Sequence, residues 1–266
     1  MPPSLLGPLA VIGAATLWGS NHVVARGIHE AVPLLAMVFW RWSLAVAILI
    51  PFSWGALTRD WPELKRHWRY LLTTGFVGVG IFSLLLFAGA YETQALQVGL
   101  LNATTPIWVL VLARLFRGER VQAGQVLGIA LGILGVVILL TRGDLMRLGG
   151  VEWHRGDLWS ILAAITFAWF SLRLRDRPPT ISQTSLTVAT GSAGLLVSLP
   201  LFLWHLATGG GVALHDPGAP NAATMLAAMG FIVVGPTLLG NLFWTIGCSA
   251  IGAKRAAPFL YLMPVV

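Results

Sequence analysis

The chain has 266 residues, of which 56% are hydrophobic and only 10% are charged, whereas an ordinary globular domain has about 25% charged residues. A water-soluble fold of this size could not bury so much apolar surface, so the composition excludes a soluble enzyme and predicts an all-α membrane protein. The formal charge of +7 does not indicate a nucleic-acid partner, because the basic residues lie in short clusters between apolar stretches rather than along one exposed face.

Apolar stretches of about 20 residues, the length of helix that crosses a bilayer, succeed one another along the chain. We predict transmembrane helices over residues 5–25, 34–53, 70–90, 95–115, 122–141, 157–174, 184–205, 224–247 and 252 to the end. The first stretch has no basic segment before it and no small-residue cleavage site after it, so we interpret it as a retained helix. The connections are short and carry Pro, Gly or clustered charge, which is typical of loops.

The Lys and Arg residues between these helices predict the orientation, because cytoplasmic loops are enriched in them. With the N-terminus in the cytoplasm, twelve fall on the cytoplasmic side: Arg59, Lys65, Arg66, Arg69, Arg114, Arg117, Arg120, Arg173, Arg175, Arg177, Lys254 and Arg255. Four fall on the other side: Arg26, Arg142, Arg147 and Arg155. We therefore expect a cytoplasmic N-terminus.

A weak internal repeat relates the two halves of the chain. A shift of 158 residues superposes Gly89 on Gly247 and Pro106 on Pro264, and a shift of 149 residues superposes Gly7 on Gly156. A unit of five helices is odd in number, so its second copy would enter the membrane from the opposite side, a plan that recurs in secondary transporters. We expect a first five-helix unit at 1–143 and an inverted second unit at 156–266.

The repeat also predicts that the natural protein extends past residue 266. Since Pro264 corresponds to Pro106, the second unit stops within its fourth helix. We expect the rest of the ninth helix and a tenth helix to lie beyond residue 266, so that the complete fold is a ten-helix inverted 5+5 repeat.

Several motifs are familiar: the segment 14–21 (AATLWGSN), Arg41, the segment 102–106 (NATTP), and Gly118-Glu119 before a glycine-rich stretch. In these the chain resembles the EamA-type proteins of the drug/metabolite transporter superfamily, and its many tryptophans look most like bacterial aromatic amino-acid exporters of the YddG type. The resemblance implies a ten-helix carrier of the bacterial inner membrane with two five-helix repeats and a small-molecule substrate.

The acidic residues indicate which substrates are improbable for such a carrier. All ten lie in predicted loops or at helix ends, although a carboxylate kept in mid-membrane usually serves transport. This pattern argues against a pump that exchanges protons and cationic drugs on a buried Glu, and it favours a neutral or zwitterionic substrate.

The candidate substrate-binding residues are polar and aromatic side chains within the predicted helices. They are Trp18, Asn21, His22, Asn102, Trp108, Trp169, Asn241, Trp244 and Tyr261. Each also has a structural interpretation: the amides could bond between helices, His22 could bond a backbone carbonyl instead of exchanging protons, and the rings could pack against lipid.

A second group would act in gating or structure. Arg41 lies between two tryptophans, where it snorkels or pairs helices, or else provides a carboxylate-binding or gating charge. Pro106, Pro236 and Pro264 interrupt helical hydrogen bonding, so their helices can bend. The glycines at 124, 128 and 132 form a small-residue stripe that packs within the fold or in a homodimer.

The leading prediction is a secondary transporter that exports amino acids, aromatic or bulky neutral ones, or related metabolites by alternating access. A nucleotide-sugar or organophosphate exchanger would need several buried cations, and only Arg41 qualifies. A membrane-embedded transferase would need a catalytic cluster, to which His154, Arg155 and Asp157 come nearest. A receptor that binds without flux is a further alternative. No catalytic residue, cofactor or metal site is predicted, and the single cysteine, Cys248, is interpreted as packing.

Overall fold

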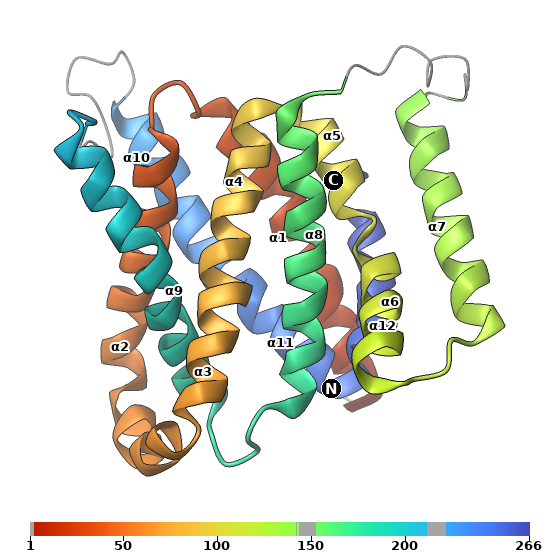
Figure 1. The fold of residues 1–266 in the computed structure, drawn as a ribbon, viewed down its shortest axis with the longest axis horizontal. Helices are drawn as coiled ribbons and strands as arrows, with labels where there is room; N and C mark the ends of the chain where they lie inside the picture. The colour runs from red at the N-terminus through yellow and green to blue at the C-terminus, as the bar shows by residue number, and fades with distance from the viewer. Residues whose placement is uncertain (1–2, 142, 144–152, 212–221) are drawn as a thin grey trace.

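A computed structural model describes residues 3–141, 143, 153–211 and 222–266, and this part of the chain is helical with no strand. The first half contains α1 (Pro3–Gly27), α2 (Leu34–Arg66), α3 (Trp68–Gly75), η1 (Phe76–Ile81), α4 (Phe82–Glu92), α5 (Ala95–Asn102), α6 (Thr105–Arg117) and α7 (Ala123–Thr141). The second half contains α8 (Arg155–Arg173), η3 (Leu174–Asp176), α9 (Gln183–Ala207), α10 (Ala222–Ile232), η4 (Val233–Gly240), α11 (Asn241–Ile251), α12 (Ala253–Ala256) and η5 (Ala257–Leu262). The helices form one upright bundle, with α7 standing at its edge (Figure 1).

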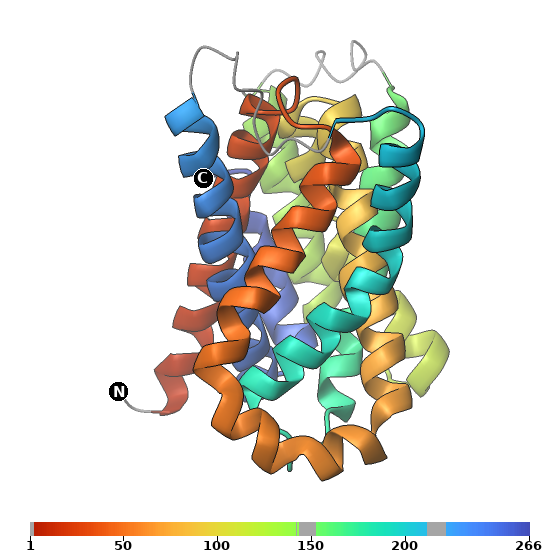
Figure 2. The ribbon, with the colours of Figure 1, turned by 90° about the vertical axis from the view of Figure 1, so that its left-hand side faces the viewer.

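Within the described residues, six helices are long and apolar enough to cross a membrane. They cover Leu34–Arg66, Trp68–Glu92, Gln97–Arg117, Arg155–Asp176, Gln183–Ala207 and Ala223–Ile251. The helix α1 runs beside them through the bundle (Figures 1 and 2). This is the architecture of a multi-pass membrane protein, in which helices satisfy their backbone polar groups internally.

Successive connections between the long helices alternate between the two ends of the bundle, as the predicted topology requires (Figure 1). The α2–α3 turn, the α6–α7 loop and the α8–α9 loop lie at the same end as the N-terminus (Figure 1). These connections and the helix ends that flank them carry most of the Lys and Arg residues, and we name this end of the bundle the basic end. Its cytoplasmic location stays a prediction.

Three predicted helix boundaries were wrong. The second helix was predicted to end at residue 53 but continues to Arg66, and its last turns run across the basic end (Figure 2). Pro51 and Pro62 both lie inside α2, so neither proline ends the helix. The apolar pattern therefore ended before the helix did.

The predicted helix 95–115 is divided in two, and the predicted ninth helix is short. The proline ring of Pro106 would clash with the carbonyl of Asn102, and α5 ends at Asn102 before α6 begins at Thr105. Beyond residue 252 the chain forms only the four-residue α12 and then the 3-10 helix η5, with Pro258 in its first turn.

Two wider π-helical segments interrupt the third and eighth predicted helices. They are η1 within 68–92 and η4 within 222–251. The shift of 158 residues that defines the repeat moves residues 76–81 onto 234–239, inside η4. Sequence periodicity did not predict these segments, which are rare in proteins and often lie at functional sites.

The packing between the halves is reciprocal. The helix α1 packs on α11, α4 packs on α8, and α2 packs on α9. A Cβ atom on Gly247 would lie 3.3 Å from the Gly7 carbonyl oxygen, and one on Gly156 would lie 2.9 Å from that of Gly89. The predicted repeat exchanges these two glycine pairs. The pattern is what an inverted 5+5 repeat requires, and the repeat remains a prediction.

The helix α7 makes fewer contacts than its neighbours. Its Gly132 packs against the Tyr261 ring of η5, whereas a Cβ on Gly124 or Gly128 would meet nothing within 4 Å. Part of the predicted small-residue stripe therefore packs within the fold. The possible homodimer stays a prediction.

Candidate functional site

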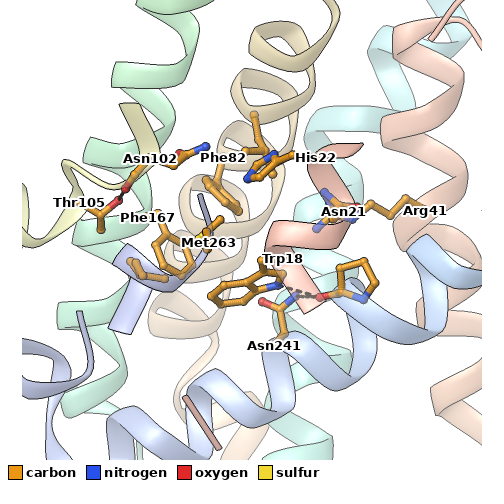
Figure 3. Close-up of a pocket in the computed structure, with 13 residues that line it drawn as sticks. Trp18, Asn21, His22, Arg41, Phe82, Asn102, Thr105, Phe167, Asn241 and Met263 are labelled. Atoms are coloured by element: carbon orange, nitrogen blue, oxygen red, sulfur yellow. Dashed lines mark hydrogen bonds between the residues drawn. The ribbon is translucent and has the colours of Figure 1, made fainter. Parts of the chain in front are cut away.

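A small cavity of about 30 Å³ lies inside the bundle, where both halves meet (Figure 3). Its lining residues are Trp18, Asn21, His22, Arg41, Phe82, Leu86, Asn102, Thr105, Phe167, Pro236, Asn241, Leu260 and Met263. The space holds one or two water molecules and no larger solute. The site is therefore too narrow for an amino acid in this conformation.

One wall of the cavity is aromatic. The Trp18 and Phe167 rings meet edge to face with centroids 5.2 Å apart, and the Phe82 ring lies 5.0 Å from that of Phe167. Trp18 Nε1 donates a hydrogen bond of 2.9 Å to the carbonyl oxygen of Pro236 in η4, which fixes the indole. These rings offer an apolar surface with stacking geometry.

The remaining wall is polar, and much of it has no partner. Asn21 Oδ1, both ring nitrogens of His22, Arg41 Nη1 and Asn102 Nδ2 are buried without a hydrogen-bond partner among the described residues. Each of these four residues is at most 6% exposed. A buried unsatisfied polar group costs about 1–3 kcal/mol, so this cluster is poor packing but suitable for a polar ligand.

Arg41 is held by its neighbours rather than by the membrane interface. Its Nε donates a 2.7 Å hydrogen bond to Thr237 Oγ1, and its guanidinium lies 5.0 Å from the centroid of the Phe87 ring. Thr237 in turn donates to the carbonyl of Ile232, five residues earlier, through the π-helical turn of η4. The snorkelling interpretation of Arg41 is therefore wrong, because the side chain is directed into the bundle (Figure 3).

Of the other predicted site residues, some line the cavity and some do not. Asn241 lines the cavity, and its Nδ2 donates to the Thr237 carbonyl at 2.8 Å. His22 was expected to bond a backbone carbonyl, and this expectation was wrong, because neither ring nitrogen has such a partner in the described structure. Pro236 lines the cavity, whereas Pro106 and Pro264 lie outside its lining.

Four predicted aromatic residues lie outside the cavity in this conformation. Trp244 is fully buried behind Trp18, with ring centroids 5.4 Å apart, and donates to Ser171 Oγ. Trp108 donates to Thr104 Oγ1 at 3.2 Å within its own helix. The remaining two are Trp169, which lines a groove between α6 and α8, and Tyr261, which donates to the Ile129 carbonyl of α7.

Sequence reasoning missed the apolar lining residues. Phe82, Leu86, Phe167, Leu260 and Met263 line the cavity but have the same residue types as the core. The glycine-rich π segment η1 lies immediately before Phe82.

An ion cluster joins the halves at the basic end. Glu119, after α6, accepts from Arg175 Nη1 at 2.8 Å and pairs with Lys254 Nζ at 2.5 Å. The hydrogen bond from Lys254 lowers the pKa of the Glu119 carboxyl below its usual value. Because Arg175 and Lys254 belong to the second half, these contacts join the two halves at the basic end.

Contacts between the halves are also present at the opposite end. Asp157 of α8 accepts from Thr93 Oγ1 at 2.9 Å and from the backbone N–H of His154 at 2.8 Å. The carboxylate is therefore a helix cap that ties α8 to the α4–α5 turn. These contacts give the Asp157 carboxylate and the His154 backbone a structural role.

The comparisons with known proteins agree with this architecture. Residues 5–141 match the model of the EamA-like transporter family. The chain is 25% identical to an uncharacterized transporter of Bacillus subtilis, YyaM, over 97% of this chain and 82% of the relative. It is 27% identical to a probable terminal-alkyne amino-acid exporter of Streptantibioticus cattleyicolor, over 97% of this chain and 81% of the relative.

Two further matches bear on substrate and fold. A riboflavin transporter of Rhizobium johnstonii is 26% identical over 96% of this chain and 78% of the relative. A solved structure, described as the crystal structure of a protein, superposes with a TM-score of 0.68 at 20% identity, covering 99% of this chain and 84% of that chain. The relatives share the transporter description but differ in substrate.

Proposed function

Because this chain belongs to the EamA-like transporter family, we propose that it is a secondary transporter that exports amino acids with aromatic or bulky neutral side chains, or related small metabolites. It acts as a carrier and not as an enzyme. The bilayer is the bacterial inner membrane, and the basic end faces the cytoplasm. The two five-helix units rock against each other, so that the cavity between them opens to one side at a time.

The observation that carries this proposal is the set of unpartnered polar atoms beside an aromatic wall. Arg41 Nη1 and Asn102 Nδ2 are hydrogen-bond donors, which suit a substrate carboxylate. Asn21 Oδ1 and a neutral His22 nitrogen are acceptors, which suit an ammonium group. The Trp18 and Phe167 rings would then contact the side chain of the amino acid.

The charge of the cavity favours an amino acid over a phosphorylated metabolite. Arg41 is the one cation among the lining residues, and no Asp or Glu is present among them. A single cation balances one carboxylate, and the neutral acceptors of Asn21 and His22 would bind the ammonium group, whereas a phosphate dianion would need a second cation, which the lining does not hold. The relative named as an amino-acid exporter points in the same direction.

Transport requires the closed cavity to open. The π-helical segments η1 and η4 and the internal Pro236 weaken regular helical bonding next to the cavity, so they are suitable points of bending. The Glu119 ion cluster would separate when the basic end opens, and the Asp157 contacts would separate when the other end opens.

Counterflow in proteoliposomes tests the substrate class. We expect vesicles loaded with phenylalanine, tryptophan or leucine to accumulate the radiolabelled amino acid with saturable kinetics. Empty vesicles and vesicles loaded with glycine are the controls. Saturable exchange of riboflavin or of a sugar phosphate, without exchange of any amino acid, would contradict the proposal.

Asn102→Ala should raise the half-saturation concentration for amino-acid exchange about tenfold. The variant removes one buried donor to the substrate, and a hydrogen bond to a charged group contributes about 1.5–3 kcal/mol, part of which water recovers. Initial rates of counterflow over a concentration series measure the effect. Gln122→Ala, an exposed amide between α6 and α7, is the matched control and should keep wild-type kinetics. Equal kinetics in both variants would remove Asn102 from the site.

Glu119→Gln should open the basic end more often, because it removes the charge that Arg175 and Lys254 share. The single cysteine, Cys248, is buried in α11, so its labelling requires the packing around it to open. We expect its labelling by a maleimide to accelerate roughly fivefold, which corresponds to a loss of about 1 kcal/mol from partly exposed pairs. Glu30→Gln, at an exposed carboxylate of the opposite end, should leave the rate unchanged. A wild-type labelling rate in Glu119→Gln would show that the cluster does not hold the halves together.

A further inference from the structure

A second polar feature lies outside the cavity, on the flank of the bundle at the basic end. A groove of about 410 Å³ runs between the last turns of α6 and α8, lined by Phe116, Arg117, Trp169, Leu172, Arg173 and Asp176. None of these residues lines the central cavity. We propose that this groove binds the headgroup of an anionic phospholipid from the cytoplasmic leaflet.

The charges of the groove favour an anion. It holds two arginines and one carboxylate. Arg117 Nη2 donates to Asp176 Oδ2 and to the Leu172 carbonyl, both at 2.8 Å. Arg173 Nη1 lies 3.7 Å from the same carboxylate oxygen, beyond hydrogen-bond distance. Arg173 donates no hydrogen bond to any residue that the structure describes; its Nε is buried, and its two Nη groups remain for a ligand phosphate.

Aromatic rings hold the Arg173 guanidinium in place. Arg173 Cζ lies 4.7 Å from the centroid of the Tyr70 ring and 5.7 Å from that of Trp169. The Tyr70 hydroxyl donates to the Arg173 carbonyl at 2.9 Å, which anchors the backbone as well. The cation is therefore oriented before a ligand arrives, which lowers the entropy cost of binding.

The surroundings of the groove favour a lipid over a soluble anion. Phe116 and the neighbouring Leu115 are each at least 70% exposed on the flank of α6. Beside them an apolar cleft of about 370 Å³ separates α6 from α7, and its lining includes Leu110, Leu115 and Val126. A phosphate at the arginines would place its acyl chain along this apolar surface. Basic pockets at the cytoplasmic ends of helices bind anionic headgroups in this way.

The groove lies at the basic end, where the Lys and Arg residues collect. It would therefore contact lipids of one leaflet only. The inference rests on the proposed cytoplasmic orientation of that end, but not on the proposed substrate. A carrier of any substrate with this groove would bind the lipid, so failure of amino-acid transport would leave this inference intact.

The test measures lipid binding to the purified full chain in detergent. Phosphatidylglycerol added at about ten times its dissociation constant should raise the melting temperature by about 3 °C, while phosphatidylcholine with the same acyl chains should not. Arg173→Gln should lose most of this shift. Arg66→Gln, an exposed arginine at the same end with a partner in its own helix, should keep it.

The other possible results of the lipid-binding test also decide whether the groove is a lipid site. Equal shifts with both lipids would overturn the proposal, and so would a full shift with inorganic phosphate alone, which would make this a site for the free ion. An equal loss in Arg66→Gln would indicate general attraction and not a site. If Arg173→Gln does not fold, native mass spectrometry of the wild type must show retention of phosphatidylglycerol over phosphatidylcholine, and equal retention would overturn the proposal.

Discussion

Arg41→Gln should raise the half-saturation concentration for amino-acid exchange about 100-fold. Arg41 is the only cation among the residues that line the cavity, and its Nη1 has no protein partner there. Charge-assisted hydrogen bonds contribute about 1.5–3 kcal/mol each, and the variant removes both the charge and the donor. Counterflow over a concentration series measures the loss.

The melting temperature separates this role from a structural one. In the empty carrier an incompletely paired buried charge is a cost, so Arg41→Gln should melt at the wild-type temperature or above it. Arg41→Lys keeps the charge but not the planar fork, and it should recover part of the affinity. Wild-type exchange in Arg41→Gln, or a large fall in its melting temperature together with the loss of exchange, would contradict a direct role in substrate binding.

Gly75→Ala should lower the melting temperature by about 5–10 °C or prevent folding. A Cβ on Gly75 would lie 2.2 Å from the Thr190 carbonyl oxygen and 2.6 Å from Ala193 Cβ, so α3 and α9 would have to separate. Overpacking of this kind costs about 1–3 kcal/mol, or more where the obstacle is backbone. Each kcal/mol corresponds to about 2–4 °C in a chain of this length.

A matched glycine gives the control. A Cβ on Gly128 of α7 would meet nothing within 4 Å, and alanine is the better helix former by about 1 kcal/mol. Gly128→Ala should therefore melt at the wild-type temperature or slightly above it in a fluorescence-detected melt. A similar fall in both variants would show that the close contact between α3 and α9 is not what Gly75 provides.

The fold was predictable for the helices whose limits depend on the thickness of the bilayer alone. Apolar length predicted α7, α8 and α9 to within two residues, because the bilayer sets that length. Proline did not give a uniform signal: α5 ends four residues before Pro106, whereas α2 continues through Pro51. The difference depends on what surrounds the unpaired carbonyl, and a single sequence does not contain this information. The same holds for the π-helical turns η1 and η4.

The site was predictable through its polar members. A buried Asn, His or Arg is costly in lipid, so Asn21, His22 and Arg41 stood out from the apolar stretch around each of them. Tryptophan was a weaker signal, because it serves packing as well as binding: Trp18 lines the cavity while Trp244 packs behind it. Apolar lining residues such as Leu260 carry no signal until the helices are placed.

The small size of the closed cavity affects every affinity that will be measured. Under the proposed function, a substrate would bind only the molecules whose halves have separated, so its observed dissociation constant would equal the intrinsic constant divided by the fraction of such molecules. Weakening the ion pairs of Glu119 would increase that fraction without substituting any residue that lines the cavity. Such a variant would bind amino acids more tightly than the wild type, and a compound that fastens the two halves together would inhibit without competing for any residue that the substrate touches.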